Sequence, residues 1–390
     1  MTSRWIPFTD RVLLPMIDLP AEDSLPGRIQ QLLDSNHQQL VLAESCTAGL
    51  AASRLGGVPG ISEHFCGSAV VYQEGTKQDW LDIPASLLAD QGAVSEPVAG
   101  QMALQSLQQT RAATLAASIT GHLGPGAPAE LDGQVFVGVA LREMPGQVPA
   151  MLVVGRRLEP ASREQRQQRA ADFLLETTHR VLQVLDACRQ LEQGEGRRSV
   201  RPPDGPGRGD KVIFPGAFNP MHAGHREMMQ VAQQLTGNPV ALEISLENVD
   251  KPLLPASVAV ARIAPLVDDT VWITRAPTFV EKAELFPGST FVTGVDTIGR
   301  IGQPRYYDDT GLSCQQAIEK IGERGCRFLV FGRVMNSQFQ TGCSGEPAGF
   351  CSLEDLEIPV PLREICEAVS EQQFRQDIAS RELRPSSGES

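Results

Sequence analysis

Short apolar runs alternate with longer, mostly polar segments along most of this 390-residue chain. Each run has the length and the Val, Leu, Ile and Ala content of a buried strand, and the segments between the runs have room for helices. In the first half the runs cover residues 40–43, 69–72, 114–119 and 134–140. Because strands that alternate with helices pack as layers around a sheet, the pattern predicts an α/β fold.

A change in composition near the middle of the chain divides this pattern into two units. Residues 163–191 are polar with apolar residues at helical spacing, which predicts a long helix that closes the first unit. The stretch after it is rich in Gly, Pro and Arg, as flexible linkers are. The predicted organisation is an N-terminal arm (1–28), a first α/β domain (29–191), a flexible linker (192–210), a second α/β domain (211–384) and a disordered tail (385–390). We expect the linker to separate two independent cores.

Composition narrows the class of protein. A length of 390 residues suits two or three domains, and a hydrophobic content of 41% is ordinary for globular chains. The net charge of -13 argues against nucleic acid as the main partner, since binding phosphates along a strand needs a basic face. No stretch is long and apolar enough to span a bilayer, and the first residues have no signal-peptide core, so we expect a cytoplasmic protein without membrane contact. The eight cysteines form no CxxC pair and predict reduced thiols.

The segment 216–225, Gly-Ala-Phe-Asn-Pro-Met-His-Ala-Gly-His, carries the densest chemistry in the chain. It follows the apolar run 211–215, which predicts a buried strand, and it precedes a segment with a helical pattern. A glycine turn between a strand and a helix N-terminus presents unpaired N–H groups and the positive end of the helix dipole to an anion. His222 and His225 are three residues apart, so both can face such an anion from the first helical turn.

This segment resembles the GxFNPxHxGH signature of the nucleotidyltransferase superfamily, with every fixed position present. The resemblance implies a Rossmann-like domain with a parallel sheet, in which a phosphate of the acceptor attacks the α-phosphate of ATP and pyrophosphate leaves. His222 and His225 would be catalytic donors to nonbridging oxygens, and Gly216, Phe218 and Asn219 would bind the nucleotide. We expect a Mg²⁺ ion held mostly by substrate oxygens and water, and no metal site made by the protein alone.

Further elements favour a pyridine mononucleotide as the acceptor. Lys251, followed by Ser257 and Arg262, resembles the lysine–serine–arginine segment of nicotinate- and nicotinamide-mononucleotide adenylyltransferases, in which the lysine approaches substrate phosphate. Gly294 and Asp296 resemble the G-x-D-[ST] turn of that family, which lies near the nucleotide. Taken alone, the lysine is equally a solvated surface charge, and the alternative for the aspartate is a helix cap.

The segment 378–384 departs from the family pattern. The family closes with I-S-S-T-x-[IL]-R, whose hydroxyls and helix N-terminus bind the triphosphate. Ser380 and Arg384 align with this pattern and would bind the nucleotide, whereas the first serine and the threonine are absent. Either Arg381 supplies charge in place of a hydroxyl, or the segment is the end of an unrelated amphipathic helix. Both interpretations stay open, and with them the activity of this half toward ATP.

The first half carries its own motif, Ala43–Gly49 with the sequence Ala-Glu-Ser-Cys-Thr-Ala-Gly, directly after an apolar run. It resembles the A-E-S-C-T-[AG]-G motif of the CinA C-terminal domain family, the nicotinamide-nucleotide amidases. Further elements of that family follow in order: Tyr72 and Lys77 of Y-x-x-x-x-K, residues 92–99 for G-A-V-S-E-x-V-A, and residues 118–126 for V-T-G-x-x-G-P-G.

This resemblance implies hydrolysis of a carboxamide on a mononucleotide, with release of ammonia. Ser45 would be the nucleophile and Lys77 its base, which requires that the amine be desolvated or lie near other cations, and Tyr72 would assist. The alternative for Ser45 is a plain helix N-cap. Cys46 is a rival nucleophile on the same turn, although we expect it to be a buried structural thiol.

The hydrogen-bond donors of this site are expected from the glycine-rich turn at residues 120–126. Thr120 and the glycines Gly121, Gly124 and Gly126 would supply backbone N–H donors to the oxyanion or to substrate phosphate. The family's closing arginine corresponds to Arg163 only ambiguously.

The two resemblances explain each other, because the deamidated mononucleotide made by the first half would be the acceptor for the second. The leading hypothesis is a bifunctional enzyme of pyridine-nucleotide salvage, with small-molecule nucleotides as partners and a homo-oligomeric state. One alternative joins the amidase to a cytidylyl- or adenylyltransferase for another phosphorylated acceptor. Another is a non-enzymatic nucleotide sensor in which one or both sites are degenerate.

Overall fold

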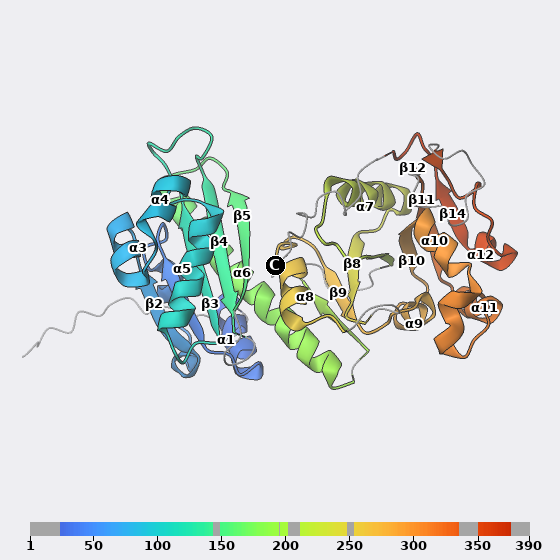
Figure 1. Ribbon diagram of the computed structural model, residues 1–390, viewed down its shortest axis with the longest axis horizontal. Coiled ribbons are helices and arrows are strands. Elements are labelled where there is room, and N and C mark those ends of the chain that lie inside the picture. The colour runs from blue at the N-terminus through green and yellow to red at the C-terminus, as the bar shows by residue number, and fades with distance from the viewer. Residues whose placement is uncertain are drawn as a thin grey trace, which may run out of the picture.

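The computed structural model describes residues 24–142, 149–194, 196–201, 211–247, 253–334 and 350–375. They form two lobes, each built around its own β-sheet with helices packed against it, as Figure 1 shows. The predicted α/β class with two domains is confirmed. Lys251, Ser380 and Arg384 lie outside the described residues.

The first lobe is a mixed five-stranded sheet between layers of helices. Its strands lie in the order β2-β1-β3-β4-β5, with β1 parallel to both of its neighbours and β4 antiparallel to both β3 and β5. Helix α5 covers one face, while α1, α2 and α6 pack together on the other. The elements are α1 (Leu25–Ser35), β1 (Leu40–Glu44), α2 (Leu50–Gly56), a short 3-10 helix (Ile61–Glu63), β2 (Phe65–Val70), α3 (Glu74–Leu81), α4 (Ala85–Gln91), α5 (Glu96–Gln109), β3 (Leu115–Gly121), β4 (Gln134–Leu141), β5 (Ala150–Arg157) and α6 (Arg163–Glu192).

The second lobe is a mostly parallel seven-stranded sheet in the order β14-β11-β10-β7-β8-β9-β6. The first strand of this lobe's parallel set, β7, lies in the middle, so the chain proceeds from it first to one side and then to the other. Its elements are β6 (Arg197–Val200), β7 (Val212–Pro215), α7 (Ala223–Thr236), β8 (Val240–Ser245), α8 (Ala256–Ile263), β9 (Val271–Thr274), α9 (Phe279–Leu285), β10 (Thr290–Gly294), α10 (Val295–Ile301), a 3-10 helix (Pro304–Thr310), α11 (Cys314–Glu323), β11 (Arg327–Phe331), β12 (Arg333–Val334), β13 (Phe350–Cys351), α12 (Val360–Glu364) and β14 (Cys366–Val369).

This strand order creates a topological switch point between β7 and β10. In open parallel sheets, ligands bind outside the carboxyl ends of the strands at such a point. Alternate residues of β7 serve opposite faces: Val212 and Phe214 join the core beside α6, α7 and α8, whereas Ile213 joins the core beside α9, α10 and α11. The segment 216–225 therefore begins at the end of the sheet where this fold places ligands.

Helix α6 belongs to both lobes, which contradicts the expectation of two independent cores. Its start is fixed by a capping box, in which Ser162 and Gln165 satisfy each other's backbone N–H groups. Its first half packs on β3 and β4, and its second half packs against α8, β6 and β9 of the second lobe, so one continuous cluster of buried apolar residues joins the two. Figure 1 shows the helix passing from one lobe beneath the other.

A buried cation reinforces this junction. Arg180 is 2% exposed, and one of its guanidinium nitrogens donates to the carbonyls of Leu266 and Asp269 at 2.6 and 2.7 Å. The carboxylate of Asp269 in turn accepts from Arg226 of α7 at 2.6 Å. Burial lowers the pKa of Arg180 to about 10, although the nearby acids oppose the shift. The periodicity of α6 predicts a helix, but it does not show that two sheets share its faces.

Two predicted boundaries need correction. Within the predicted linker, Arg197–Val200 forms strand β6, which pairs antiparallel with β9. The strand is held because Val200 is fully buried and the Arg197 guanidinium lies 4.9 Å from the centre of the Trp272 ring. The predicted arm lies outside the described residues up to residue 23, and its end belongs to α1, which Ser24 caps.

The cysteines only partly follow expectation. Six described cysteines carry free thiols, as reduced chemistry predicts. Cys351 of β13, however, is disulfide-bonded.

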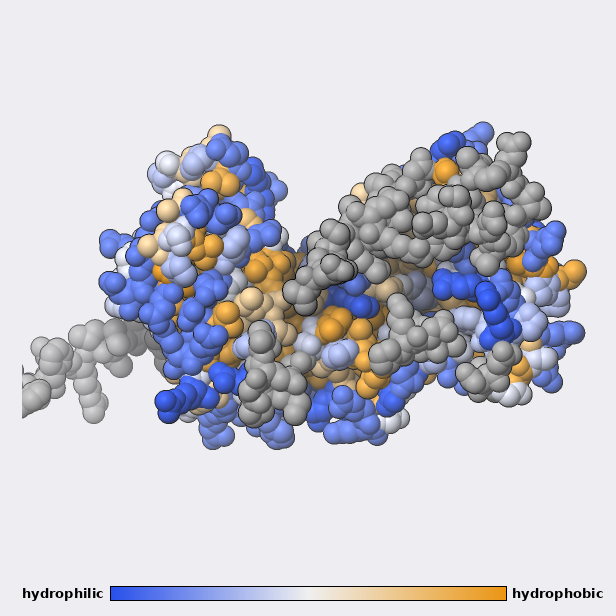
Figure 2. Space-filling model, in the orientation of Figure 1, coloured by the Kyte–Doolittle hydropathy of each residue, from blue (hydrophilic) through white to orange (hydrophobic). Residues whose placement is uncertain are grey.

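Hydrophilic residues cover most of the visible face of the first lobe, and hydrophobic residues gather toward the waist between the lobes (Figure 2).

Candidate functional site

Ser45 lies at the carboxyl end of the central parallel strand of the first sheet. It follows β1 directly, and its N–H donates to the Ile119 carbonyl of β3 at 3.0 Å, which extends the sheet pairing by one residue. The helix after this turn begins only at Leu50, with Gly49 as its N-cap, so the alternative of Ser45 as a plain N-cap does not hold. The hydroxyl is therefore left for other chemistry.

Glu44 is the residue that caps α2, although it lies in the preceding strand. Its fully buried carboxylate accepts from the N–H groups of Gly49 and Ala51 at 3.1 Å and of Ala52 at 2.8 Å. The Thr47 hydroxyl adds a fourth donor at 2.7 Å. A carboxylate at a helix N-terminus is favoured by the dipole and by the orphan N–H groups. The turn that carries Ser45 is thereby fastened to the helix that follows it.

Lys77 meets Ser45 inside the protein. This lysine lies in α3 and is 1% exposed, and its Nζ donates to Ser45 Oγ at 2.9 Å and to the Val71 carbonyl at 3.0 Å. Burial is the main cause that lowers the pKa of Lys77 below its ordinary value. A serine hydroxyl in contact with a desolvated amine is the arrangement that nucleophilic catalysis by serine requires.

Cys46 is a poor rival to Ser45. Its side chain is buried, at 5% exposure, and burial raises the pKa of the thiol to about 12. Since the thiolate is the reactive form of cysteine, this environment suppresses its nucleophilicity. The backbone of the same turn is held by Gln167 of α6, whose amide donates to the carbonyls of Cys46 and Thr47 at 3.3 Å.

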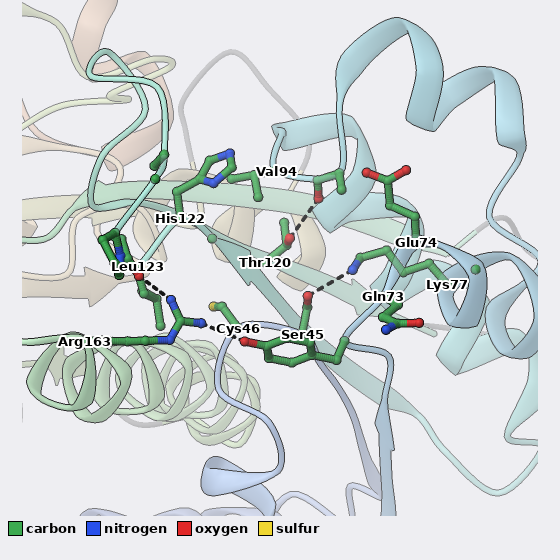
Figure 3. Close-up of a pocket in the computed structure, with 18 residues that line it drawn as sticks. Ser45, Cys46, Gln73, Glu74, Lys77, Val94, Thr120, His122, Leu123 and Arg163 are labelled. Carbon is green, nitrogen blue, oxygen red and sulfur yellow. Dashed lines mark hydrogen bonds between the residues drawn. The ribbon is translucent and has the colours of Figure 1, made fainter.

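The Ser45–Lys77 pair opens onto a cavity of about 680 Å³. Figure 3 shows Arg163 of α6 and Lys77 of α3 reaching this cavity from opposite sides, with Ser45 between them. One Arg163 nitrogen donates to the hydroxyl of Tyr72 at 2.6 Å, and another donates to the Gly124 carbonyl. Tyr72 is thus bonded to Arg163 rather than to the serine or the lysine, and its ring is half exposed.

The predicted donor turn, residues 120–126, also lines this cavity. The Thr120 hydroxyl donates to the Ala93 carbonyl at 2.8 Å, so its proton is already committed within the protein. The His122 N–H donates to the Gln134 carbonyl at 2.9 Å. Among the described residues, the N–H groups of Gly124 and Gly126 have no such acceptor. These two glycines, together with Gly121, line the cavity as predicted.

An ion pair beneath this turn was not predicted from the sequence. Arg166 is 5% exposed and binds both carboxylate oxygens of Asp132, at 2.7 and 2.8 Å. The hydrogen bond from Arg166 lowers the pKa of Asp132. Gly124 has a φ of 64°, and a Cβ there would lie 3.1 Å from the Arg166 guanidinium, so the turn needs glycine. The i, i+3, i+4 spacing places Arg163, Arg166 and Gln167 on one face at the start of α6, but it does not identify Asp132 as a partner.

In the second lobe, His222 and His225 stack on each other at the start of α7. Their ring centroids are 3.7 Å apart with 23° between the planes. His222 is the N-cap, and its N–H donates to His225 Nδ1 at 3.4 Å, which leaves the proton of a neutral His225 on Nε2. Burial lowers the pKa of both, to about 4 for His225. Both rings are therefore neutral donors at ordinary pH.

The turn before these histidines is packed around Phe218. Its ring makes edge contacts with Phe214 and His225, with both pairs of centroids 5.2 Å apart. A Cβ at Gly216 would lie 2.6 Å from the Phe218 ring, so only glycine fits there. Phe218 itself has a φ of 41°, a conformation that bulky residues rarely adopt. Such strain persists where the surrounding structure fixes it, often at binding sites.

Asp296 lies on the other side of the switch point. It is in the first turn of α10, which directly follows β10 and Gly294, and β10 is the parallel neighbour of β7. Its carboxylate accepts from Arg333 at 2.6 Å. The topology thus brings Gly216, Gly294 and Asp296 to the carboxyl ends of neighbouring strands, where the histidines also lie. The structure describes neither Lys251 nor the closing segment 378–384, so their placement stays a prediction.

Comparison with protein families agrees with this division. The model of the CinA C-terminal domain matches residues 22–182, and the cytidylyltransferase-like model matches residues 213–370. The first half therefore matches the CinA C-terminal domain family, and the second half matches cytidylyltransferase-like domains. Both resemblances in the sequence are confirmed.

Two curated relatives bear the name of the first of these domains. A CinA-like protein of Syntrophotalea carbinolica is 35% identical over 134 residues, which cover 34% of this chain and 32% of that protein. A CinA-like protein of Synechococcus elongatus is 41% identical over 120 residues, covering 30% of this chain and 28% of that protein. The chain thus spans about a third of the length of the curated relatives it matches.

Two solved structures match part of this chain. A CinA superfamily protein of Klebsiella pneumoniae is 24% identical with a TM-score of 0.38, covering 42% of this chain and 98% of that chain. The competence/damage inducible protein CihA of Agrobacterium tumefaciens is 28% identical with a TM-score of 0.37, covering 41% of this chain and 96% of that chain. Within the described residues of this chain, no helix could cross a membrane, and no group of three or more His, Cys, Asp or Glu could hold a metal ion.

Proposed function

We propose that the first half hydrolyses the carboxamide of nicotinamide mononucleotide to nicotinate mononucleotide, and that the second half transfers an adenylyl group from ATP to the mononucleotide. The observation that carries the proposal is the buried Lys77 amine 2.9 Å from the Ser45 hydroxyl. The second part rests on the paired rings of His222 and His225, beside the central strand of a parallel sheet.

In the amidase reaction, Ser45 Oγ would attack the carboxamide carbon while its proton passes to the neutral amine of Lys77. The Val71 carbonyl, 3.0 Å from Nζ, accepts one amine hydrogen and so helps to turn the nitrogen lone pair toward the hydroxyl. Because burial lowers the pKa of Lys77, the neutral amine is easier to reach than in a solvated lysine. The substrate oxygen gains negative charge, and the N–H groups of Gly124 and Gly126 are the candidates to stabilise it.

The tetrahedral intermediate would collapse when its carbon–nitrogen bond breaks. Lys77 returns the proton to the departing nitrogen, which leaves as ammonia, and Ser45 keeps the acyl group as an ester. A water molecule then attacks the ester carbon and gives a proton to Lys77, which passes it to the departing Ser45 oxygen. The net reaction consumes water and releases ammonia and the acid, and the serine and lysine are regenerated.

Substrate binding in the first half would use the cavity beside this pair. A volume of about 680 Å³ is within the range of small-molecule sites, and the guanidinium of Arg163 lines it. A planar, always charged guanidinium suits the phosphate of a mononucleotide. Tyr72, held by Arg163, would close the same side of the cavity against the nicotinamide ring.

In the second half, the start of α7 would receive the phosphates of ATP. Helix α7 has no acidic residue in its first turn, so its dipole and N–H groups remain favourable to an anion. Nε2–H of His225 and the His222 ring would donate to nonbridging oxygens of the α-phosphate as charge accumulates there. Mg²⁺ would arrive with ATP, held mostly by phosphate oxygens and water.

The test is direct assay of both products with the purified chain. Nicotinamide mononucleotide should give ammonia without ATP, and nicotinate mononucleotide with MgATP should give pyrophosphate. Turnover with CTP and a phosphorylated alcohol instead would reassign the acceptor of the second half. Saturable nucleotide binding without either product would favour a non-enzymatic sensor.

A further inference from the structure

A second cavity lies at the junction of the lobes, away from both proposed sites. Its volume is about 550 Å³, within the range of small-molecule sites, which often occur at domain interfaces. Its walls come from α1 and α6 on one side and from β6 and β9 on the other. Neither the amidase motifs nor the transferase motif supplies any of its lining residues.

The charge of this cavity is positive. Arg28 of α1 and Arg197 and Arg198 of β6 line it, and Asp186 is the single acid among the described residues that line it. The Asp186 carboxylate already accepts from Arg189 and from Gln190, each at 2.7 Å. Arginines from separate elements that line one cavity favour a ligand that carries phosphate, because each guanidinium is positively charged and offers a planar fork of hydrogen-bond donors.

Two polar side chains beside the cavity have groups without a hydrogen-bond partner among the described residues. His179 of α6 is 3% exposed, lines the cavity and makes no hydrogen bond among the described residues. Burial, with the charges of Arg28 and Arg180, lowers its pKa to about 4, so the ring is neutral. Oε1 of Gln183, one turn further along α6, is buried without a donor. Buried polar groups of this kind are normally satisfied, by protein, water or ligand.

We propose that this junction cavity binds a phosphorylated small molecule of up to nucleotide size, with its phosphate held by Arg28 and Arg198 and its other polar groups meeting His179 and Gln183. Trp272 of β9, on which Arg197 stacks, forms the far wall. Because α1 and α6 supply one side and β6 and β9 the other, such a ligand fastens the two lobes together. The site is independent of whether either half is an enzyme.

Inorganic pyrophosphate is the probe for the charge of the site, and Trp272 is the reporter. The chain has three tryptophans, so a protein with Trp5→Phe and Trp80→Phe retains Trp272 as its single fluorophore. Titration with pyrophosphate should produce a saturable change in its emission in the sub-millimolar range. The apparent affinity should fall as salt is added. Binding should also raise the unfolding temperature, because a ligand that binds only the folded state stabilises it.

Charge changes at Gln31 make the test specific. This exposed residue of α1 lines the cavity, so its substitution disturbs no packed core. Gln31→Glu should weaken pyrophosphate binding roughly fivefold and Gln31→Lys should strengthen it by a similar factor, the Coulomb effect of one charge several ångströms away. Arg28→Gln with Arg198→Gln should weaken binding roughly tenfold or more. Arg111→Gln, which removes an exposed guanidinium outside the cavity, should leave binding unchanged.

The transferase site needs its own control, since it also would bind pyrophosphate. His222→Ala combined with His225→Ala should leave the Trp272 response intact. Loss of the response in that variant would assign the signal to the transferase site and overturn the proposal. No saturable response in the wild type, or equal affinity in Gln31→Glu and Gln31→Lys, would overturn it as well.

Discussion

The two halves place their candidate chemistry at the same topological position but prepare it differently. Each site begins at the end of a strand that has a parallel neighbour on each side, after β1 in one lobe and after β7 in the other. In the first, the buried carboxylate of Glu44 occupies the N-terminus of the following helix. In the second, the first turn of α7 carries no acid. The same strand–turn–helix unit therefore repels an anion at one helix and can receive one at the other.

This difference matches what the two reactions require. Acyl transfer to serine needs a neutral base in contact with the hydroxyl. Lys77 meets this need because its side chain is buried, at 1% exposure, and burial favours the neutral amine. Adenylyl transfer needs donors and dipoles around phosphate but no nucleophile from the protein, and His222 and His225 sit at an accessible helix end. An internal carboxylate that secures one turn would be harmful at the other. The predictions below probe this contrast, beginning with the largest expected effect.

Removing either member of the Ser45–Lys77 pair should nearly abolish ammonia release. Ser45→Ala and Lys77→Met should each lower the rate by roughly a thousandfold or more, and the double variant should be scarcely worse, because a nucleophile and its base act as a unit. Methionine fills the buried space of Lys77 without an amine. Steady-state ammonia assays measure the loss, and Cys46→Ala is the matched control. Full activity in Ser45→Ala with loss in Cys46→Ala would transfer the role to the thiol.

At the other site, His222→Ala or His225→Ala should lower pyrophosphate formation roughly a hundredfold, the scale of losing one transition-state donor. Ammonia release by the same proteins should stay within about twofold, since neither ring contacts the first cavity. Unchanged transferase rates in both variants would remove the α-phosphate role from this turn. An equal loss of both activities would mean that the substitutions damage the shared core instead.

Arg180 tests whether the lobes are one cooperative unit. Arg180→Met leaves the buried carbonyls of Leu266 and Asp269 without their donor, which should lower the free energy of unfolding by roughly 2–4 kcal/mol. Both lobes should lose stability together in urea titrations followed by probes in each. Arg324→Met, which removes an exposed ion pair 3.9 Å long, should change it by less than about 1 kcal/mol. Separate transitions, with the first lobe unaffected, would restore the idea of independent cores.

The pH profiles should also separate the halves. Lys77 acts as a base only when neutral, and its pKa lies below the ordinary lysine value, so ammonia release should rise up to tenfold per pH unit and level off below pH 10.5. His225, with a pKa of about 4, is neutral throughout the range above it, so its protonation should not alter pyrophosphate formation between about pH 6 and 8. Rate profiles of each activity measure both. A flat amidase profile would argue against Lys77 as the base.

Much of this arrangement could be predicted from the sequence, because local motifs encode it. The runs of β1 and β7 and the turns after them identify Ser45, His222 and His225 without any knowledge of packing. Lys77 is also found by motif, but its burial is a property of the packed lobe. Tyr72 shows the limit, since the structure bonds it to Arg163 rather than to the catalytic pair.

What could not be predicted depends on contacts between distant segments. The polar sequence of α6 indicates a helix, yet its second half is buried only because β6 and α8 of the other lobe pack on it. Strand β6 itself lies in a stretch whose Gly and Arg content is typical of a linker. The Arg166–Asp132 pair joins positions 34 residues apart and has no periodic signature. Each of these is a tertiary effect that overrides local composition.

The most direct measurement follows both products from one mixture of nicotinamide mononucleotide and MgATP by mass spectrometry. The wild type should release ammonia and accumulate the deamidated dinucleotide together with pyrophosphate. Ser45→Ala should form that dinucleotide only when nicotinate mononucleotide is supplied, and His222→Ala with His225→Ala should stop at nicotinate mononucleotide. A wild-type protein that forms neither nicotinate mononucleotide nor the deamidated dinucleotide would contradict the account.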